Sequence, residues 1–178
     1  AKLLHFACRP AWAMCAGEHY GFRRQPGACV HRRAVLFLKE DLWIVVDCLT
    51  GNGNHAARLH WLCGDLPWSY DSGAGTLDLD TPAGSFYIEV LDDCGRPISG
   101  DVVAGQEDPP RGWLSRYYGE KIAVPSLAVE TTRVFPTTFV SVLSGGRSLI
   151  HVDGDRWSVR LGGPRVAFWP AVGLSLAL

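Results

Sequence analysis

The sequence lacks an excess of charge and a long apolar run. It holds 17 lysines and arginines against 18 aspartates and glutamates, for a formal net charge of −1. A chain this close to neutral offers no electrostatic footprint for a polyphosphate, so a nucleic-acid partner is not expected. The longest apolar stretch, residues 166–178, is shorter than the ~20 residues of a membrane span and is broken by Pro170 and Gly173. We therefore expect no membrane partner.

The composition of a helical bundle is also missing. Methionine occurs once, whereas glycine and proline supply 31 of the 178 residues, more than the ordinary ~12%. Apolar residues make up 47% and include seven tryptophans, enough for a sizeable core, which excludes disorder. This composition indicates many short strands joined by tight turns.

No C-x-x-C pair occurs among the six cysteines, so the usual zinc-ribbon and redox signatures are absent. A chain of this size and apolar content does not need disulfides. We expect mostly buried free thiols, because an unpaired cysteine behaves as a small hydrophobic residue.

Runs rich in β-branched and aromatic residues recur along the whole chain, separated by polar turns. The predicted strands are 28–38, 42–50, 56–63, 76–80, 85–91, 121–130, 134–143, 148–152, 156–161 and 165–169. Residues 100–111 are predicted to form an irregular loop, and no helix longer than two turns is expected.

The hairpin around Lys39, Glu40 and Asp41 can be predicted in more detail. A turn at these residues places opposite one another the positions whose numbers sum to 80, so that Arg33 faces Asp47 as an ion pair. Both faces of the hairpin are then apolar, with Trp43 on one and Ile44 on the other, and both are expected to be buried. Two-sided burial of antiparallel strands predicts an all-β, layered antiparallel β-sandwich of the supersandwich kind.

Several short motifs follow one another in a fixed order. They are EHYGF at 18–22, HRR at 31–33, LWIVVD at 42–47, GxGxH at 51–55, LHWL at 59–62, GWLSRYYGEK at 112–121 and PTTF at 136–139. In order and spacing they resemble the heparinase II/III-like family over residues 12–143.

The resemblance implies an α-helical toroid followed by layered β-sheets, in polysaccharide lyases that cleave uronic-acid-containing glycans by β-elimination. Residues 1–178 would form a single β-sandwich domain, the C-terminal part of a longer chain whose α-toroid domain is absent here and is its expected partner. An acidic polysaccharide is the expected ligand, and the location implied is periplasmic or extracellular.

β-Elimination needs a base for the C5 proton, a proton donor for the leaving oxygen and neutralisation of the uronate carboxylate. In the family these groups come from the toroid and from a His-x-His-x-Asp segment, which has no match in this sequence. The resemblance therefore places no catalytic residue in this chain.

A structural zinc is implied for the full-length parent, and His60 is the candidate ligand in this sequence. The isolated chain is expected to hold no cofactor, since one or two histidines are too few for a closed zinc site. A hydrogen-bonded structural role is the alternative for His60. The same two roles, metal ligand and structural residue, are the alternatives for His55.

Four residues form the candidate contact with an acidic glycan, namely Arg116, Tyr117, Tyr118 and Lys121. Aromatic faces stack on sugar rings, and guanidinium groups pair with carboxylates. An ordinary amphipathic strand entry is the alternative interpretation of this segment.

Other polar residues carry weaker hypotheses. His19 and Tyr20 are adjacent, so on a strand they face opposite ways and do not form one acid–base pair. Asp78 and Asp80 are expected on a solvated strand face. The sequence as a whole predicts the C-terminal β domain of a polysaccharide lyase that scaffolds the glycan cleft; the alternative is a non-catalytic carbohydrate-binding or structural module.

Overall fold

The structure is a computed structural model of the whole chain, and it describes residues 1–38, 41–154, 156–160, 166–169 and 175–177. Almost every element is a strand, and a 3-10 turn, η1 (Gly21–Arg24), is the one helical element among these residues. No helix in this part of the chain is long and apolar enough to cross a membrane.

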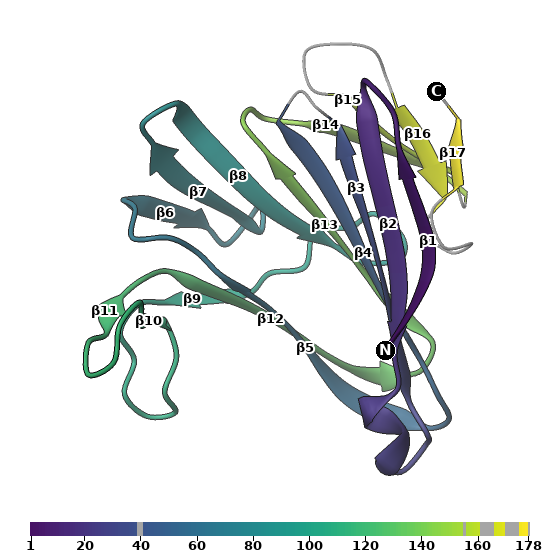
Figure 1. Cartoon of the computed structure of the whole chain (residues 1–178), viewed down its shortest axis with the longest axis horizontal. Helices are drawn as coiled ribbons and strands as arrows, with labels where there is room; N and C mark the ends of the chain where they lie inside the picture. Colours follow the sequence, from purple (N-terminus) through teal and green to yellow (C-terminus); the bar gives the residue numbers. More distant parts are fainter. Residues whose placement is uncertain (39–40, 155, 161–165, 170–174, 178) are drawn as a thin grey trace.

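The strands form four antiparallel sheets (Figure 1). The central sheet has eight strands in the order β1 (Lys2–Cys8), β2 (Trp12–His19), β3 (Val30–Leu38), β4 (Leu42–Thr50), β13 (Thr137–Ser144), β8 (Gly84–Leu91), β7 (Thr76–Thr81) and β6 (Trp68–Asp71). The three-stranded sheet has the order β5 (Asn54–Leu62), β12 (Ser126–Val134) and β9 (Asp101–Val103). The four-stranded sheet comprises β14 (Leu149–Asp153), β15 (Arg156–Arg160), β16 (Val166–Trp169) and β17 (Ser175–Ala177), and β10 (Trp113–Leu114) pairs with β11 (Ile122–Ala123).

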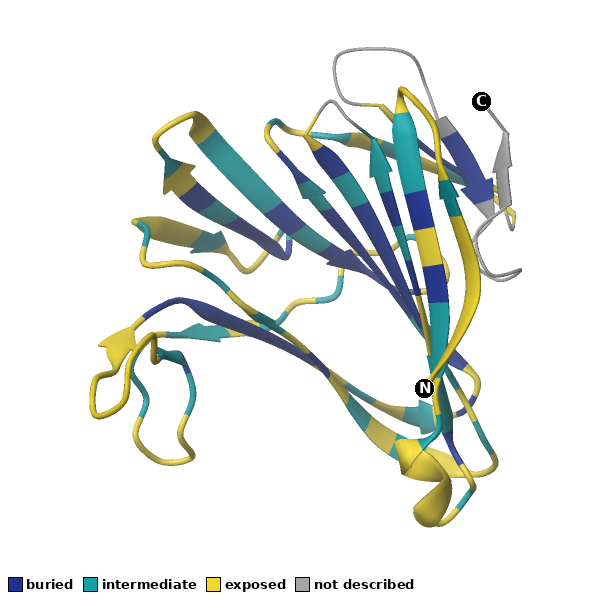
Figure 2. Ribbon diagram, in the orientation of Figure 1, coloured by how far each residue is buried: buried dark blue, intermediate teal, exposed yellow. Residues whose placement is uncertain are grey.

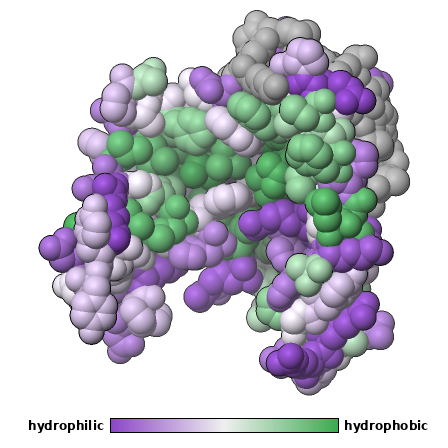
Figure 3. Space-filling view, in the orientation of Figure 1, coloured by the Kyte–Doolittle hydropathy of each residue, from purple (hydrophilic) through white to green (hydrophobic). Residues whose placement is uncertain are grey.

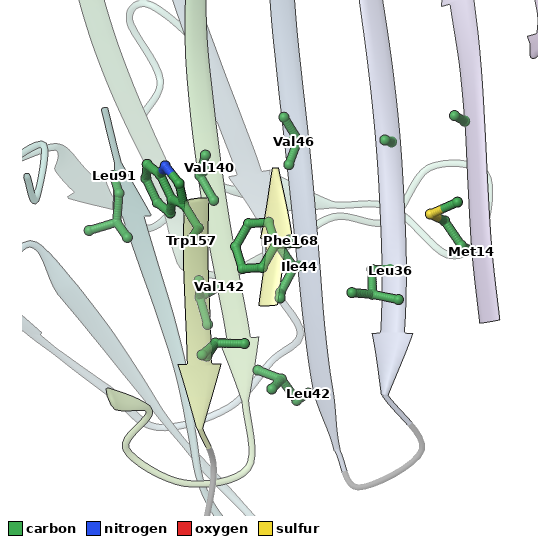
Figure 4. Close-up of a cluster of buried hydrophobic side chains, with 13 residues drawn as sticks. Met14, Leu36, Leu42, Ile44, Val46, Leu91, Val140, Val142, Trp157 and Phe168 are labelled. Atoms are coloured by element: carbon green, nitrogen blue, oxygen red, sulfur yellow. The ribbon is translucent and has the colours of Figure 1, made fainter. Parts of the chain in front are cut away.

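Both faces of the central sheet are apolar, and a smaller sheet packs on each. On what we call face one, Trp157 and Phe168 of the four-stranded sheet contact Leu36, Ile44 and Val142, and all five side chains are at most 1% exposed (Figure 4). On face two, Leu59, Leu127 and Val129 of the three-stranded sheet pack against β7, β8 and β13. Figure 2 shows buried residues along β12 and β13. The predicted layered β-sandwich is therefore confirmed, with the central sheet as its middle layer.

The register predicted for the β3–β4 hairpin is confirmed throughout. Val30 pairs with Thr50, Arg33 with Asp47 and Leu38 with Leu42, so every pair sums to 80. Asp41 takes a positive φ of 59°, in the left-handed region that aspartate tolerates in turns; Lys39 and Glu40 lie outside the described residues.

Burial on the two sides of this hairpin is unequal. Ile44 on face one is fully buried, but Trp43 on face two is only half-buried, stacked on Phe37 with 4.5 Å between the ring centroids. The expectation that both would be largely buried holds for Ile44 and only in part for Trp43, because the three-stranded sheet does not extend over all of face two.

Proline explains two differences between the predicted and observed strands. The run at 121–130 splits into β11 and β12 around Pro125, and the run at 134–143 begins only at Thr137, after Pro136. A proline has no N–H to donate to a ladder, so neither residue sits inside a paired strand. The predicted loop at 100–111 contains a short strand, β9, and β1, β2 and β6 are strands that the sequence did not indicate.

The cysteines depart from expectation in their burial. No disulfide joins the six, all of which are described, but only Cys29 is buried; Cys8, Cys15 and Cys94 are exposed. The prediction of mostly buried thiols is wrong, because β1 and β2 direct cysteines onto a part of face two that no other sheet covers.

Replacing a residue of the covered face should weaken the fold strongly. Ile44→Ala deletes a fully buried side chain between two sheets and is expected to lower the free energy of unfolding by about 2–5 kcal/mol. Leu149→Ala, at a side chain 64% exposed, serves as the control and should change it by less than about 0.5 kcal/mol. Urea unfolding followed by tryptophan fluorescence measures both, and equal effects would contradict the layered packing.

Candidate functional site

A hollow lies between face two of the central sheet and β5. It has a volume of about 400 Å³, with β3 and β4 as its floor, β5 as one wall, and Phe22 and Phe135 near its end. Three histidines, His31, His55 and His60, line it together with Arg33 and Arg58. In the same orientation as Figure 1, apolar side chains gather over the central sheet, while the η1 turn and the β10–β11 hairpin are mostly polar (Figure 3).

A buried carboxylate organises the floor of this hollow. The side chain of Asp47 on β4 is 3% exposed, and its Oδ1 lies 2.6 Å from His31 Nε2. Arg33 donates from Nε to Oδ1 at 2.6 Å and from Nη2 to Oδ2 at 3.0 Å, a bidentate pair. Arg33 is directly opposite Asp47, and His31 stands two residues earlier on the same face of β3, so the hairpin register brings all three together.

The sequence predicted the Arg33–Asp47 pair but not the histidine. The spacing of the two residues could have indicated it, because His31 and Arg33 are two positions apart and therefore lie on the same face of the strand. Arg33 also lies over the ring of Trp61 on β5, 5.6 Å from its centroid, and so connects the central sheet to the three-stranded sheet.

Burial favours the protonated form of Asp47 and opposes its ionisation. The hydrogen bonds from His31 and Arg33 outweigh that effect, and the pKa of Asp47 is held below its ordinary value. The group is therefore a stable anion shared between two donors, and its negative charge is neutralised where it lies.

His55 faces the same hollow from the start of β5 and is held by its surroundings. Its Nε2 lies 2.8 Å from the Asn52 carbonyl oxygen and 3.5 Å from Cys29 Sγ, and its ring lies 4.8 Å from that of Phe135. These contacts fit the structural alternative, since they fix the turn between β4 and β5.

His60 and Arg58 share the outer face of β5, as predicted, whereas Leu59 faces the core. His60 Nε2 is hydrogen-bonded to Ser126 Oγ on β12. Burial and the positive charges of Arg111 and Arg58 lower the pKa of His60, which favours the neutral imidazole.

The donors around His60 do not fit a closed zinc site. Such a site needs about four nitrogen, sulfur or carboxylate ligands. Within the described ranges, the one group of three or more possible ligands is Asp92, Asp93 and Cys94, which does not include His60. No step of any mechanism is therefore assigned to a metal held by this chain.

The predicted glycan-contacting residues lie elsewhere, in and beside the loop that joins β10 to β11. Tyr117 is 73% exposed, Tyr118 is fully exposed, and Arg116 is exposed beside them. The Lys121 side chain already has partners in this domain: its Nζ lies 3.1 Å from Glu107 Oε1 and 3.8 Å from the ring centroid of Trp113. None of the four lines the hollow, so the structure does not bring them together with His60.

The remaining candidates are also separate from one another. His19 ends β2 and is exposed, while the Tyr20 hydroxyl donates to Glu18 at 2.9 Å. Asp80 is exposed as expected, but Asp78 is half-buried and its Oδ1 is buried without a partner, which corrects the prediction of a solvated face for that residue.

Chemically, the hollow holds imidazoles that can accept or donate a proton, with His31 oriented by Asp47. No tyrosine lines it. The arrangement therefore offers a wall of fixed polar groups.

Comparison with known proteins identifies this architecture. The family model described as heparinase II/III-like, C-terminal, matches residues 11–159. The chain belongs to the heparinase II/III-like family.

Solved structures agree with this fold. A mutant of the heparan sulfate lyase HepC from Pedobacter heparinus superposes with a TM-score of 0.74 at 15% identity, covering 99% of this chain and 27% of that one. Two heparinase III structures give TM-scores of 0.71 and 0.69 at 12% and 13% identity, each covering 93% of this chain and 26% of theirs. The chain thus spans about a quarter of the length of these heparinase chains, and no curated protein sequence matches it.

The buried carboxylate makes the fold sensitive to acid in a defined direction. Because the folded-state pKa of Asp47 is lowered, its stabilising effect is present above the unfolded pKa of about 3.9 and is lost as pH falls through the lower folded value. Asp47→Asn should lower the free energy of unfolding at neutral pH by about 1.5–3 kcal/mol and flatten its decline below pH ~4.

Glu130→Gln is the matched control, because Glu130 forms an exposed pair with Arg58 worth no more than about 1 kcal/mol. Urea unfolding across pH 2.5–7 measures both variants. If the free energy of unfolding of Asp47→Asn fell below pH ~4 as steeply as that of the unaltered chain, this carboxylate would not stabilise the fold.

We also expect the isolated chain to bind no stoichiometric zinc, because a single imidazole at His60 holds the ion weakly without further ligands. Elemental analysis of protein purified without chelator tests this expectation. About one zinc per chain, lost in His60→Ala, would contradict it.

Proposed function

We propose that this chain is the C-terminal β domain of a polysaccharide lyase that cleaves uronic-acid-containing glycans by β-elimination, and that it acts by walling one side of the glycan cleft. The observation that carries the proposal is the family match over residues 11–159, together with a fold shared with heparan sulfate lyase and heparinase III structures. A location outside the cytoplasm, where such a polysaccharide is found, is part of the same proposal.

The chemistry explains why this domain would act as a wall. A base takes the C5 proton, the electron pair forms the C4–C5 double bond, and the C4–oxygen bond breaks as an acid protonates the leaving oxygen. Each group must lie within about 3 Å of the proton that it moves. The hollow holds histidines but no tyrosine, and the exposed Tyr117 and Tyr118 do not line it, so we propose that the catalytic groups lie outside residues 1–178.

In this proposal the β10–β11 loop contacts the acidic polysaccharide. Tyr117 and Tyr118 present their rings to solvent at an exposed loop, where ring stacking on a sugar is sterically free. Arg116 beside them supplies a guanidinium for a carboxylate. Lys121 contributes by holding the loop against Trp113 and Glu107.

The same exposed tyrosines favour one alternative, a carbohydrate-binding module without chemistry. In that case the domain would bind glycan by itself, and the longer polypeptide would not depolymerise it. The alternatives therefore differ in the activity of the whole polypeptide and agree on the loop.

The test is an elimination assay on heparan sulfate, alginate and hyaluronan, following the unsaturated uronate product near ~230 nm. We expect no sustained rise with the 178-residue chain and a rise with the longer polypeptide that carries it. A rise with the 178-residue chain that is lost in His60→Ala or Tyr118→Phe would place an active site in this domain and overturn the scaffold role.

Binding of heparan sulfate oligosaccharides to the 178-residue chain tests the loop separately. Replacing both tyrosines, Tyr117→Ala with Tyr118→Ala, should weaken binding about 30-fold, since each lost ring-stacking contact costs about 1 kcal/mol. Trp68→Ala, at a residue 40% exposed on β6 and away from the hollow, is the control for the loss of an exposed aromatic ring. If the control variant weakened glycan binding as much as the double tyrosine variant, the β10–β11 loop would not be the glycan contact.

A further inference from the structure

The GxGxH motif at residues 51–55 has no part in the proposed function. It reads GNGNH and forms the connection from β4 to β5. Asn52 and Gly53 are both exposed, and Gly53 has a positive φ of 95°, a conformation that glycine adopts readily. Because glycine has no Cβ, the side-chain amide of Asn52 and the backbone nitrogen that follows it are neighbours with nothing to shield one from the other.

Neither of these two groups is held by a hydrogen bond. Among the described residues, no partner is found for the side-chain amide of Asn52 or for Gly53 N–H. The rest of the turn is fixed: Asn52 N–H donates to the Gly27 carbonyl oxygen at 3.0 Å, and Phe135 N–H donates to the Gly53 carbonyl oxygen at 3.1 Å. The turn is therefore held at both ends, while an electrophilic amide carbon and a backbone nitrogen stay free and in water.

His55 binds the peptide group to which that nitrogen belongs. Its Nε2 lies 2.8 Å from the Asn52 carbonyl oxygen, and a carbonyl oxygen only accepts, so Nε2 carries the hydrogen and donates it. If Gly53 nitrogen loses its proton, resonance spreads the negative charge onto this same oxygen. The hydrogen bond from His55 then becomes charge-assisted and stronger, so it stabilises the anion.

Close packing keeps the imidazole in this position. Its ring lies 4.8 Å from the ring of Phe135, and Nε2 lies 3.5 Å from Cys29 Sγ. Gly27, with a φ of 86°, passes so close that a Cβ there would lie 2.5 Å from His55 Nε2. The donor is thus already in place before any charge develops on the Asn52 oxygen.

We propose that this turn is a self-modifying site, at which Asn52 loses its amide nitrogen as ammonia and becomes aspartate or isoaspartate with the assistance of His55. A base from the solvent takes the proton of Gly53 nitrogen, and this nitrogen attacks Asn52 Cγ to close a succinimide ring. The bond from Cγ to Nδ2 breaks, and Nδ2 leaves as ammonia after taking a proton from water. Water then opens the ring. Breaking the new bond to Cγ gives aspartate, and breaking the bond to the backbone carbonyl carbon of residue 52 gives isoaspartate.

The products change the turn and the hollow beside it. Either product adds a negative charge next to His55, which lines the hollow of about 400 Å³. In isoaspartate the main chain also runs through Cβ and Cγ, so one more carbon separates the N–H bound to Gly27 from the carbonyl bound to Phe135. These two hydrogen bonds do not both keep their geometry, and the turn loosens. The inference does not rest on the proposed function, because every reacting group belongs to this turn.

Ageing the 178-residue chain at mildly alkaline pH tests the proposal by mass spectrometry. The sequence contains two asparagines, Asn52 and Asn54, so peptide mapping assigns the replacement of NH2 by OH to one of them. We expect conversion and isoaspartate at residue 52. Asn54 should stay intact, because its backbone is paired with Val134 and a bulkier residue follows it. As matched variants, Asn54→Gln should convert at the rate of the unaltered chain, and Asn52→Gln should not convert.

Two further comparisons test the role of His55. His55→Phe keeps a ring against Phe135 but removes the donor, and it should slow conversion about tenfold, which corresponds to about 1.4 kcal/mol. In urea the unaltered chain and His55→Phe should convert equally fast, because the contact with Asn52 exists only in the folded turn. The unaltered folded chain should convert at least as fast as the same chain unfolded in urea, a comparison that needs no variant.

The opposite results would overturn the proposal. Slower conversion of the folded chain than of the unfolded chain would show that the folded turn protects Asn52. Equal or faster conversion of folded His55→Phe would show that the imidazole does not assist the reaction. Conversion at Asn54 in preference to Asn52 would show that the geometry of this turn does not select the reacting residue.

Discussion

The structure depends on one constraint, which is that the central sheet is apolar on both faces and each face must be buried by another layer. A sheet with one apolar face can leave the other in water, but the β3–β4 hairpin places Ile44 on one side and Val45 on the other, and both are buried. Two smaller sheets, formed by segments that follow β4 in sequence, supply most of the cover. The pair formed by Arg33 and Asp47 makes the register unique, because a slip of one residue would place the carboxylate on the opposite apolar face.

The same constraint locates the hollow. It forms where the narrower three-stranded sheet ends over a wider one, so its floor is sheet surface and its wall is a strand edge. Polar groups persist on that floor only because they satisfy one another: Asp47 accepts hydrogen bonds from His31 and Arg33. The result is a fixed and largely neutral surface, suited to supporting a partner or a cleft wall.

Much of this fold could be predicted from local patterns, and the rest depends on contacts distant in sequence. The β3–β4 register follows from counting around a three-residue turn, and the family resemblance rests on short motifs in order. The pairing of β5 with β12, some 70 residues apart, has no local signal. β1 and β2 were missed because they are rich in alanine, glycine and cysteine or expose their apolar residues. The site was harder to predict than the fold. The contact of His31 with Asp47 can be seen only once the strand register is known, and the separation of Tyr118 from His60 only once the sheet topology is known.

Residue-by-residue hydrogen exchange of the 178-residue chain under native conditions tests the central claim most directly. If stability arises from covering both faces, amides of β4 and β13 should be protected close to the global free energy of unfolding, and those of β1 and β2 should open at a distinctly lower free energy. Uniform protection from β1 to β13 would contradict the account, because the exposed strand β1 and the half-covered strand β2 would then be as stable as strands covered on both faces.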